Sequence, residues 1–140
     1  MLKQLFIGSI TMGLIILIHA EMLALYYQHS KYLRSFTKHL KGRLKNSTMI
    51  VISVFWVLFA ITIEVWLWAI VLLLLSAVTG LEPAVYFAIV CFTTLGFGDM
   101  ILTEEWRILS AMIATSGMLI FGWSTAFLFD VMQTIHNGKR

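Results

Sequence analysis

Apolar residues are concentrated in three long stretches and one short one. The long stretches cover residues 5–27, 49–78 and 108–129, and only the first two contain a titratable or charged residue. A helix needs about 20 such residues to cross a hydrocarbon core roughly 30 Å thick, so each long stretch can span a membrane. The short stretch, residues 84–92, would reach only about 15 Å as a helix. Pro83 suits the first turn of that half-helix.

The composition agrees with a membrane protein. The 140 residues are 60% hydrophobic and 12% charged, with a mean hydropathy of +0.91, which is far too apolar for a soluble domain of this size. The ionisable groups in the spans form neither a nucleophile–base set nor a metal-ligand cluster, so we expect no enzyme, no cofactor and no nucleic-acid partner. We predict an all-α membrane protein with three transmembrane helices and one re-entrant half-helix.

The basic residues follow the first long stretch. Six of the ten Lys and Arg residues lie between Lys31 and Lys45. The positive-inside rule places this segment, residues 28–47, in the cytoplasm. The C-terminal tail, residues 131–140, would lie on the same side, and the N-terminus would lie outside.

The basic segment also has a helical pattern. Its apolar positions Leu33, Phe36, Leu40 and Leu44 share one helical face. The basic residues on the rest of that helix are Lys31, Arg34, Lys38, Lys41 and Lys45. Such a helix can lie among headgroups and attract anionic lipid. An equally good explanation is that these charges only set the orientation of the protein in the membrane.

The first stretch has a competing interpretation as a secretory signal peptide. A cleavage site there would place Ile18 where a small residue is required, and cleavage would leave the basic segment outside. We therefore favour a retained transmembrane helix over residues 1–27.

The sequence TTLGFGD, residues 93–99, follows the half-helix. Non-helical backbone at membrane depth is tolerated only where protein buries it or where it lines a water-filled path. Gly96 and Gly98 can adopt positive φ angles without a Cβ clash. Alternating the backbone hand would turn successive carbonyls the same way, and closely spaced oxygens can replace the hydration shell of a monovalent cation.

This stretch resembles the TVGYGD signature of the potassium-channel pore-domain family. The segment EPAVYFAIVCF resembles the pore helix of that family, and WRILSAMIATSGMLIFGWSTAF resembles its inner helix. The resemblance implies a pore domain over residues 48–130, preceded by one additional helix. Its outer helix, pore helix, filter and inner helix would occupy residues 48–78, 83–93, 94–99 and 106–130.

The resemblance implies a homotetramer, because the family builds one filter from four loops and this chain carries one. It implies a potassium-selective cation channel in the cell membrane. Bound K⁺ would be held by the carbonyls of Thr94, Leu95, Gly96 and Phe97. The cavity and gate would involve Gly117, Met118, Phe121, Gly122, Thr125 and Asp130. The two glycines suit either a hinge or close helix packing.

The filter departs from the family pattern. Leu95 replaces a stiffer β-branched residue, and Phe97 replaces a tyrosine whose hydroxyl braces the filter, so Phe87 would supply an apolar contact instead. Some relatives pair the aspartate with a glutamate, which is Val90 here; Tyr86 is the alternative partner. The residues that would support the filter are Tyr86, Phe87, Val90, Gly98 and Asp99. Two other functions therefore stay open: a weakly selective channel that also passes Na⁺, and a non-conducting, pore-like regulatory subunit.

Glu64 interrupts the second long stretch, although a carboxylate in a span is unfavourable by roughly 2.5–3.5 kcal/mol. Counted from the cytoplasmic edge at 1.5 Å per residue, Glu64 lies at about 10 Å and His19 at about 12 Å. We predict that these two side chains pair, with Glu21 as a weaker candidate. The alternative is a neutral buried carboxyl that bonds to Thr62 or to an indole.

Overall fold

A computed structural model of the chain describes residues 1–36 and 42–137. These residues form four α-helices: α1 (Leu2–Phe36), α2 (Gly42–Leu74), α3 (Leu81–Phe92) and α4 (Arg107–Asn137). Helices α1, α2 and α4 each contain a span long and apolar enough to cross a membrane. The predicted all-α architecture, with three long apolar helices and one short one, is confirmed.

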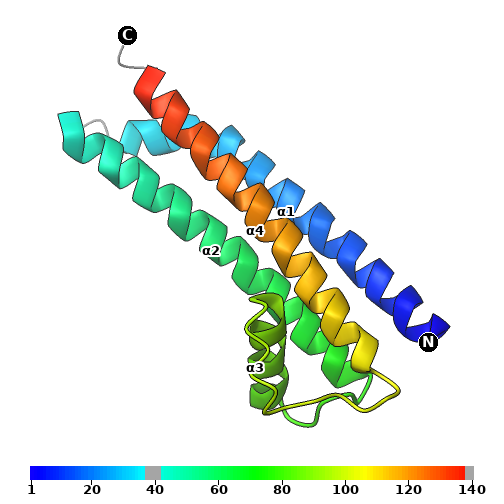
Figure 1. Cartoon of the computed structure of the whole chain (residues 1–140). Helices are drawn as coiled ribbons and strands as arrows, with labels where there is room; N and C mark the ends of the chain where they lie inside the picture. The colour runs from blue at the N-terminus through cyan, green and yellow to red at the C-terminus, as the bar shows by residue number, and fades with distance from the viewer. Residues whose placement is uncertain (37–41, 138–140) are drawn as a thin grey trace.

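The three long helices form an elongated bundle, and α3 packs beside one end of it (Figure 1). We call this end the loop end, because the connections that flank α3 also lie there. The N-terminus lies at the loop end, whereas the end of α4 lies near the start of α2 at the opposite, C-terminal end (Figure 1). The chain therefore crosses the bundle three times, and α3 turns back without crossing it.

The helices α1 and α2 extend beyond the apolar stretches. Residues 28–47 were expected to form a separate amphipathic segment, but α1 continues to Phe36 and α2 already begins at Gly42. No proline lies in this region to stop either helix, and extending an existing helix is far easier than nucleating a new one. Lys38 and Lys41 lie outside the described residues.

The helix α2 ends at Leu74, before the apolar stretch does. Ser76 has a φ angle of 52°; its amide donates to the carbonyl of Leu73, and the Ala77 amide donates to that of Leu72. This is the Schellman arrangement, which satisfies the last carbonyls of a helix through a left-handed residue. It stops the helix although the sequence stays apolar, and so turns the chain toward α3.

Each long helix buries one narrow face. On α1 the buried positions recur every three or four residues, at Gln4, Gly8, Thr11, Ile15, His19, Leu23 and Tyr26. The large apolar cluster at the loop end is centred on Trp68, Phe92 and Leu109. A smaller cluster at the C-terminal end contains Tyr26, Val57 and Phe127. Along their helices, His19 and Glu64 lie between the residues of the two clusters.

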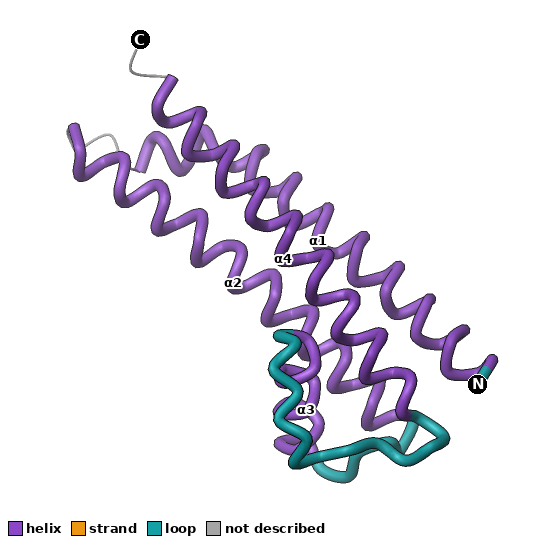
Figure 2. The backbone as a smooth tube through the Cα atoms, in the orientation of Figure 1, coloured by secondary structure: helices purple, strands orange, loops and turns teal. Residues whose placement is uncertain are grey.

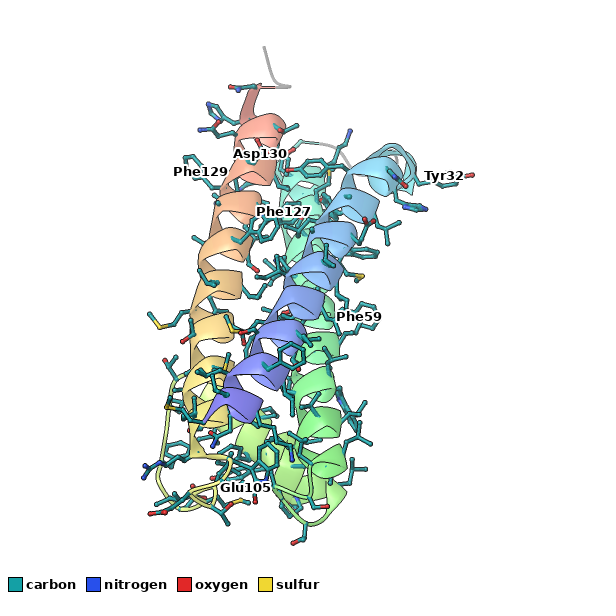
Figure 3. All side chains as sticks on the ribbon, turned by 90° about the vertical axis from the view of Figure 1, so that its right-hand side faces the viewer. Tyr32, Phe59, Glu105, Phe127, Phe129 and Asp130 are labelled. Carbon is teal, nitrogen blue, oxygen red and sulfur yellow. The ribbon has the colours of Figure 1, made fainter. Side chains whose placement is uncertain are left out.

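Large apolar side chains also cover the outside of the bundle. Phe127 points into the bundle, whereas Phe59 and Phe129 point away from it (Figure 3). A soluble protein would not leave so many aromatic and aliphatic residues in water. The exposed apolar surface and the three candidate spans together indicate a multi-pass membrane protein.

The helix α1 is attached to the start of α4. The Gln4 side-chain oxygen accepts a hydrogen bond from the amide of Ile108 at 3.0 Å, which satisfies one of the free N–H groups at a helix N-terminus. The Lys3 ammonium lies 5.3 Å from the centre of the Trp106 ring. The first helix is therefore an integral part of the bundle.

Candidate functional site

The half-helix α3 and the segment that follows it form a re-entrant hairpin. Figure 2 shows the loop after α3 running back beside that helix to the loop end. Hydrogen bonds join the two arms of the hairpin: the Gly96 amide donates to the Val90 carbonyl at 3.3 Å, and the Tyr86 hydroxyl donates to Asp99 Oδ2 at 2.7 Å. We call residues 93–99 the return segment.

The ends of α3 explain why the hairpin forms here. Gly80 precedes the helix with a φ angle of 95°, a conformation that glycine adopts without strain. At the other end, the Thr93 and Thr94 amides donate to the carbonyls of Ile89 and Cys91. The Thr93 hydroxyl also donates to the Ile89 carbonyl at 2.7 Å. These bonds use the last carbonyls of α3 and direct the chain into the return segment.

The backbone of the return segment alternates in hand. Thr94, Gly96 and Gly98 have φ angles of 61°, 55° and 77°, whereas the residues between them do not have positive φ. A left-handed conformation is strained for a β-branched residue such as threonine, by about 1–3 kcal/mol. Such strain is typical of functional segments.

The side chains of the return segment have few neighbours within one chain. Leu95 is 59% exposed and Phe97 is 65% exposed. Phe87, the residue expected to brace Phe97, is instead buried in the core cluster at the loop end. A single chain therefore leaves the apolar side of this segment uncovered.

Polar groups hold the end of the return segment against α3. The hydrogen bond to Asp99 raises the pKa of Tyr86 above its ordinary value of 10.0, so the hydroxyl stays protonated and donates. Burial raises the pKa of the nearby Cys91 thiol to about 11. A cavity of about 180 Å³ lies behind the segment, lined among others by Tyr86, Val90, Cys91 and Arg107.

The comparison with protein families decides the identity of this arrangement. A model of a family described as "Ion channel" matches residues 60–134, which is more than half of the chain. The chain belongs to the potassium-channel pore-domain family of ion channels. The match includes the second half of α2, the whole re-entrant hairpin and nearly all of α4, but not α1. Separate comparisons with curated proteins and with solved structures found no match to the chain.

Gly117 and Gly122 have different surroundings in this ion channel. Gly117 is buried, and a Cβ atom there would lie 1.9 Å from the carbonyl oxygen of Phe92 at the end of α3. At Gly122, no other group would lie within 4 Å of an added Cβ atom. Gly117 is therefore a close-packing glycine that lets α3 approach α4, and Gly122 lies on an open face.

The other cavity and gate candidates also lie on α4. Met118 is 67% exposed, and Thr125 is exposed with its hydroxyl donating to the Phe121 carbonyl at 2.8 Å. The Phe121 ring packs edge-on against Phe92, with ring centres 5.6 Å apart. Asp130, near the C-terminal end, accepts a hydrogen bond of 2.6 Å from the Tyr27 hydroxyl. Sequence reasoning did not find this link between α1 and α4.

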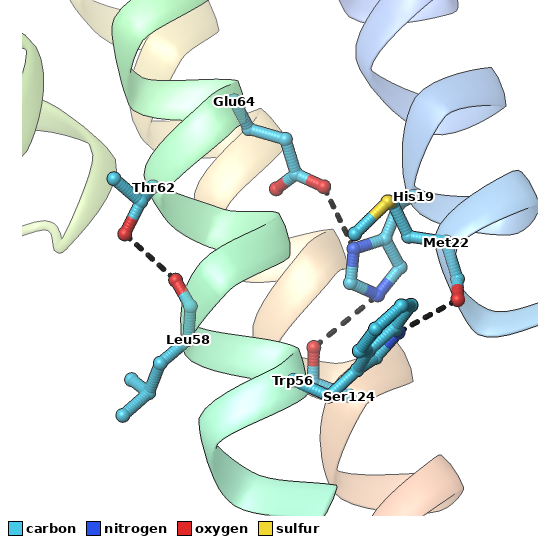
Figure 4. Close-up of polar contacts among 7 residues, drawn as sticks. All are labelled: His19, Met22, Trp56, Leu58, Thr62, Glu64 and Ser124. Atoms are coloured by element: carbon cyan, nitrogen blue, oxygen red, sulfur yellow. Dashed lines mark hydrogen bonds and ion pairs between the residues drawn. The ribbon is translucent and has the colours of Figure 1, made fainter. Parts of the chain in front are cut away.

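The structure brings His19 and Glu64 together. His19 Nδ1 lies 2.7 Å from Glu64 Oε1, and both side chains are 0% exposed (Figure 4). Thr62 instead donates to the Leu58 carbonyl, and the Trp56 indole donates to the Met22 carbonyl. The weaker candidate, Glu21, is exposed.

A third residue, Ser124 of α4, completes this buried group. Its Oγ lies 3.3 Å from His19 Nε2 (Figure 4). The available signal was the spacing of Ser116 and Ser124, because residues eight positions apart share one helical face. We call His19, Glu64 and Ser124 the polar layer.

The basic patch was predicted from Lys31, Arg34, Lys38, Lys41 and Lys45. Lys45 is half-buried near the start of α2. The side chains of Lys31 and Arg34, like the whole of Lys38 and Lys41, lie outside the described residues. The possible attraction of this patch to anionic lipid stays a prediction.

Proposed function

We propose that four copies of this chain form a potassium-selective channel that passes ions down their gradient. The observation that carries the proposal is the alternating backbone of Thr94, Gly96 and Gly98 in a re-entrant segment of an ion-channel family member. Alternation of this kind turns successive peptide carbonyls toward one side. Four such segments around a shared axis would replace the hydration shell of a dehydrated cation.

The ion-binding oxygens would be the carbonyls of Thr94, Leu95, Gly96 and Phe97, together with the Thr94 hydroxyl. One segment supplies only a quarter of such a site, so a closed fourfold assembly is required. The exposed Leu95 and Phe97 side chains support this assembly, because neighbouring copies would bury them.

In the same assembly the open face of α4 would line a water-filled cavity behind the filter. Thr115, Met118, Gly122 and Thr125 are exposed and follow helical spacing along this face. The end of α3 that carries partial negative charge would favour a cation near that cavity. Asp130 would lie near the cytoplasmic mouth, with the loop end and the N-terminus outside the cell membrane.

One observation favours a second function, a weakly selective cation channel. Phe97 carries no hydroxyl to anchor the filter, and its ring is exposed in the single chain. Leu95 has a freer χ1 angle than valine or isoleucine. A filter held less firmly would discriminate less well between K⁺ and Na⁺.

The test is flux through the purified protein in liposomes, measured with K⁺ and Na⁺ gradients and by reversal potential. The control is Gly96→Ala, because Gly96 has a φ angle of 55° but no group within 4 Å of an added Cβ atom. This variant should assemble yet lose flux or selectivity, because alanine strains the left-handed conformation. Native mass spectrometry gives the number of copies. A well-folded tetramer without flux would favour the non-conducting subunit, and a monomer would refute the proposal.

A further inference from the structure

The polar layer lies between the two apolar clusters and joins three helices. Its members come from α1, α2 and α4, and their side chains are 0% (His19), 0% (Glu64) and 4% (Ser124) exposed. The imidazole bridges the other two, because Nδ1 faces Glu64 Oε1 and Nε2 faces Ser124 Oγ (Figure 4). The Trp123 ring of α4 lies beside the imidazole, with ring centres 5.4 Å apart.

No fixed positive charge faces Glu64 among the side chains that the structure describes. Helix α4 has no charged residue between Arg107 and Asp130, and the only other charged residues of α2 are Arg43 and Lys45. On α1 the nearest charged residue, Glu21, is exposed.

The titratable residues of α1 that follow Glu21 within the described side chains bond elsewhere or lie farther along the helix, and among them Tyr27 donates to Asp130. Tyr26 hydrogen-bonds Ser53, and His29 is ten residues beyond His19, about 15 Å along the helix. Glu64 Oε2 has no hydrogen-bond partner among the described residues. A buried carboxylate without a balancing charge is strongly unfavourable, so a bound proton is the charge that can balance it.

We propose that the polar layer is an intramembrane proton-binding site whose occupancy sets how firmly α4 is held against α1 and α2. The site takes one proton from water and returns it to water. With the proton the pair is neutral overall, and the N–H at His19 Nε2 donates to Ser124. Without the proton the pair carries one negative charge, Nδ1–H donates to the carboxylate, and Ser124 must donate to Nε2. Proton release therefore reverses the hydrogen bond to α4.

The position of Ser124 links the site to the proposed pore, and this step rests on the proposed function. Helix α3 covers only the loop-end half of α4 (Figure 1). Beyond Gly122 the contacts of α4 are with α1 and α2, among them Ser124 with His19, and Asp130 with Tyr27. Ser124 is two residues past Gly122, and a glycine inside a helix is a weak point. An imidazolium donor makes a stronger bond than a neutral one, so the protonated layer holds this half of α4 more firmly.

The experiment compares four variants with the wild type in two assays between roughly pH 6 and 9. One assay is thermal melting in detergent, monitored by tryptophan fluorescence. The other is K⁺ flux in liposomes. Glu64→Gln removes the carboxylate that balances the charge of the protonated imidazole, and Ser124→Ala removes only the link to α4. Ser116→Ala is the matched control, because this buried α4 hydroxyl accepts a hydrogen bond from the Trp68 indole, which does not titrate. Glu21→Gln removes the exposed carboxylate on α1.

We expect the wild type to lose thermal stability as the pH rises, by up to about tenfold in the unfolding constant per pH unit for one proton. Flux should rise about fivefold over the same range as α4 is released. Glu64→Gln should abolish both responses. Ser124→Ala should keep the stability response and lose the flux response. Ser116→Ala and Glu21→Gln should keep both.

Two outcomes would overturn the inference. One is that the flux of Glu64→Gln depends on pH as it does in the wild type. If Glu64→Gln does not fold, the same result for Ser124→Ala overturns the inference. The other is a wild-type protein whose melting temperature does not change over this range. If the wild type conducts no ions, the proposed function fails, and the melting assay alone still decides whether the layer binds a proton.

Discussion

Replacing Gly117 with alanine tests the contact on which the position of the half-helix depends. The added Cβ atom would lie 1.9 Å from the Phe92 carbonyl oxygen and 2.8 Å from its carbonyl carbon. Ordinary contacts between such atoms begin above roughly 3 Å, so the backbones of α3 and α4 must separate by about 1 Å. Neither atom of Phe92 belongs to a flexible side chain that can rotate away. Overpacking of this kind destabilises a core by about 1–3 kcal/mol.

The matched control is Gly122→Ala on the same helix. An added Cβ atom meets nothing within 4 Å there, and alanine in a helix interior is favoured over glycine by about 0.5–1 kcal/mol. We expect Gly117→Ala to melt at a lower temperature than the wild type and Gly122→Ala to melt at an equal or higher one in the same detergent. A Gly117→Ala protein that is as stable as the wild type but does not conduct would refute the packing argument and favour a hinge.

Three further predictions concern the hairpin and the first helix. Because its pKa is raised, the Tyr86 hydroxyl should keep its hydrogen bond to Asp99 below roughly pH 10 and lose it as the pH rises through the higher pKa of the folded protein. Flux should therefore change at alkaline pH in the wild type but not in Tyr86→Phe. Equal profiles of flux against pH in the two proteins would contradict this. Cys91, with a pKa of about 11, should react slowly with N-ethylmaleimide at neutral pH and rapidly once unfolded; mass spectrometry measures both, and fast labelling of the folded protein would count against burial. Gln4→Leu leaves the Ile108 amide without its acceptor and should lower stability by about 1–3 kcal/mol, whereas Gln4→Glu keeps an acceptor; equal melting temperatures would exclude the cap.

Much of the fold was predictable because membrane thickness restricts what an apolar stretch can do. Length alone separated the three spanning helices from the half-helix, and the family resemblance is confirmed by the family match. Where α2 ends was not predictable from apolar content, because the stop depends on a left-handed conformation at Ser76, which serine adopts only rarely. The continuation of α1 to Phe36 was missed because a charged amphipathic pattern fits a separate surface helix equally well.

The site shows a similar division. Equal depth in the membrane was enough to propose that His19 faces Glu64, because both distances follow from the helical rise. Ser124 was missed, since serine is common in spanning helices and carries no charge that demands a partner. The exposure of Leu95 and Phe97 was not predictable from the sequence, because the positions of these side chains depend on the left-handed backbone at Thr94, Gly96 and Gly98.

The attachment of the first helix limits how this subunit can be shortened. A truncation that keeps only the family-matched region would remove Gln4 from the Ile108 amide and His19 from Glu64. The unpaired Glu64 carboxylate would then face lipid, which is unfavourable by a free energy of roughly 2.5–3.5 kcal/mol for each chain. A truncated form without α1 would therefore need a compensating substitution at Glu64. The helix α1 is thus a structural part of the subunit and not a removable membrane anchor.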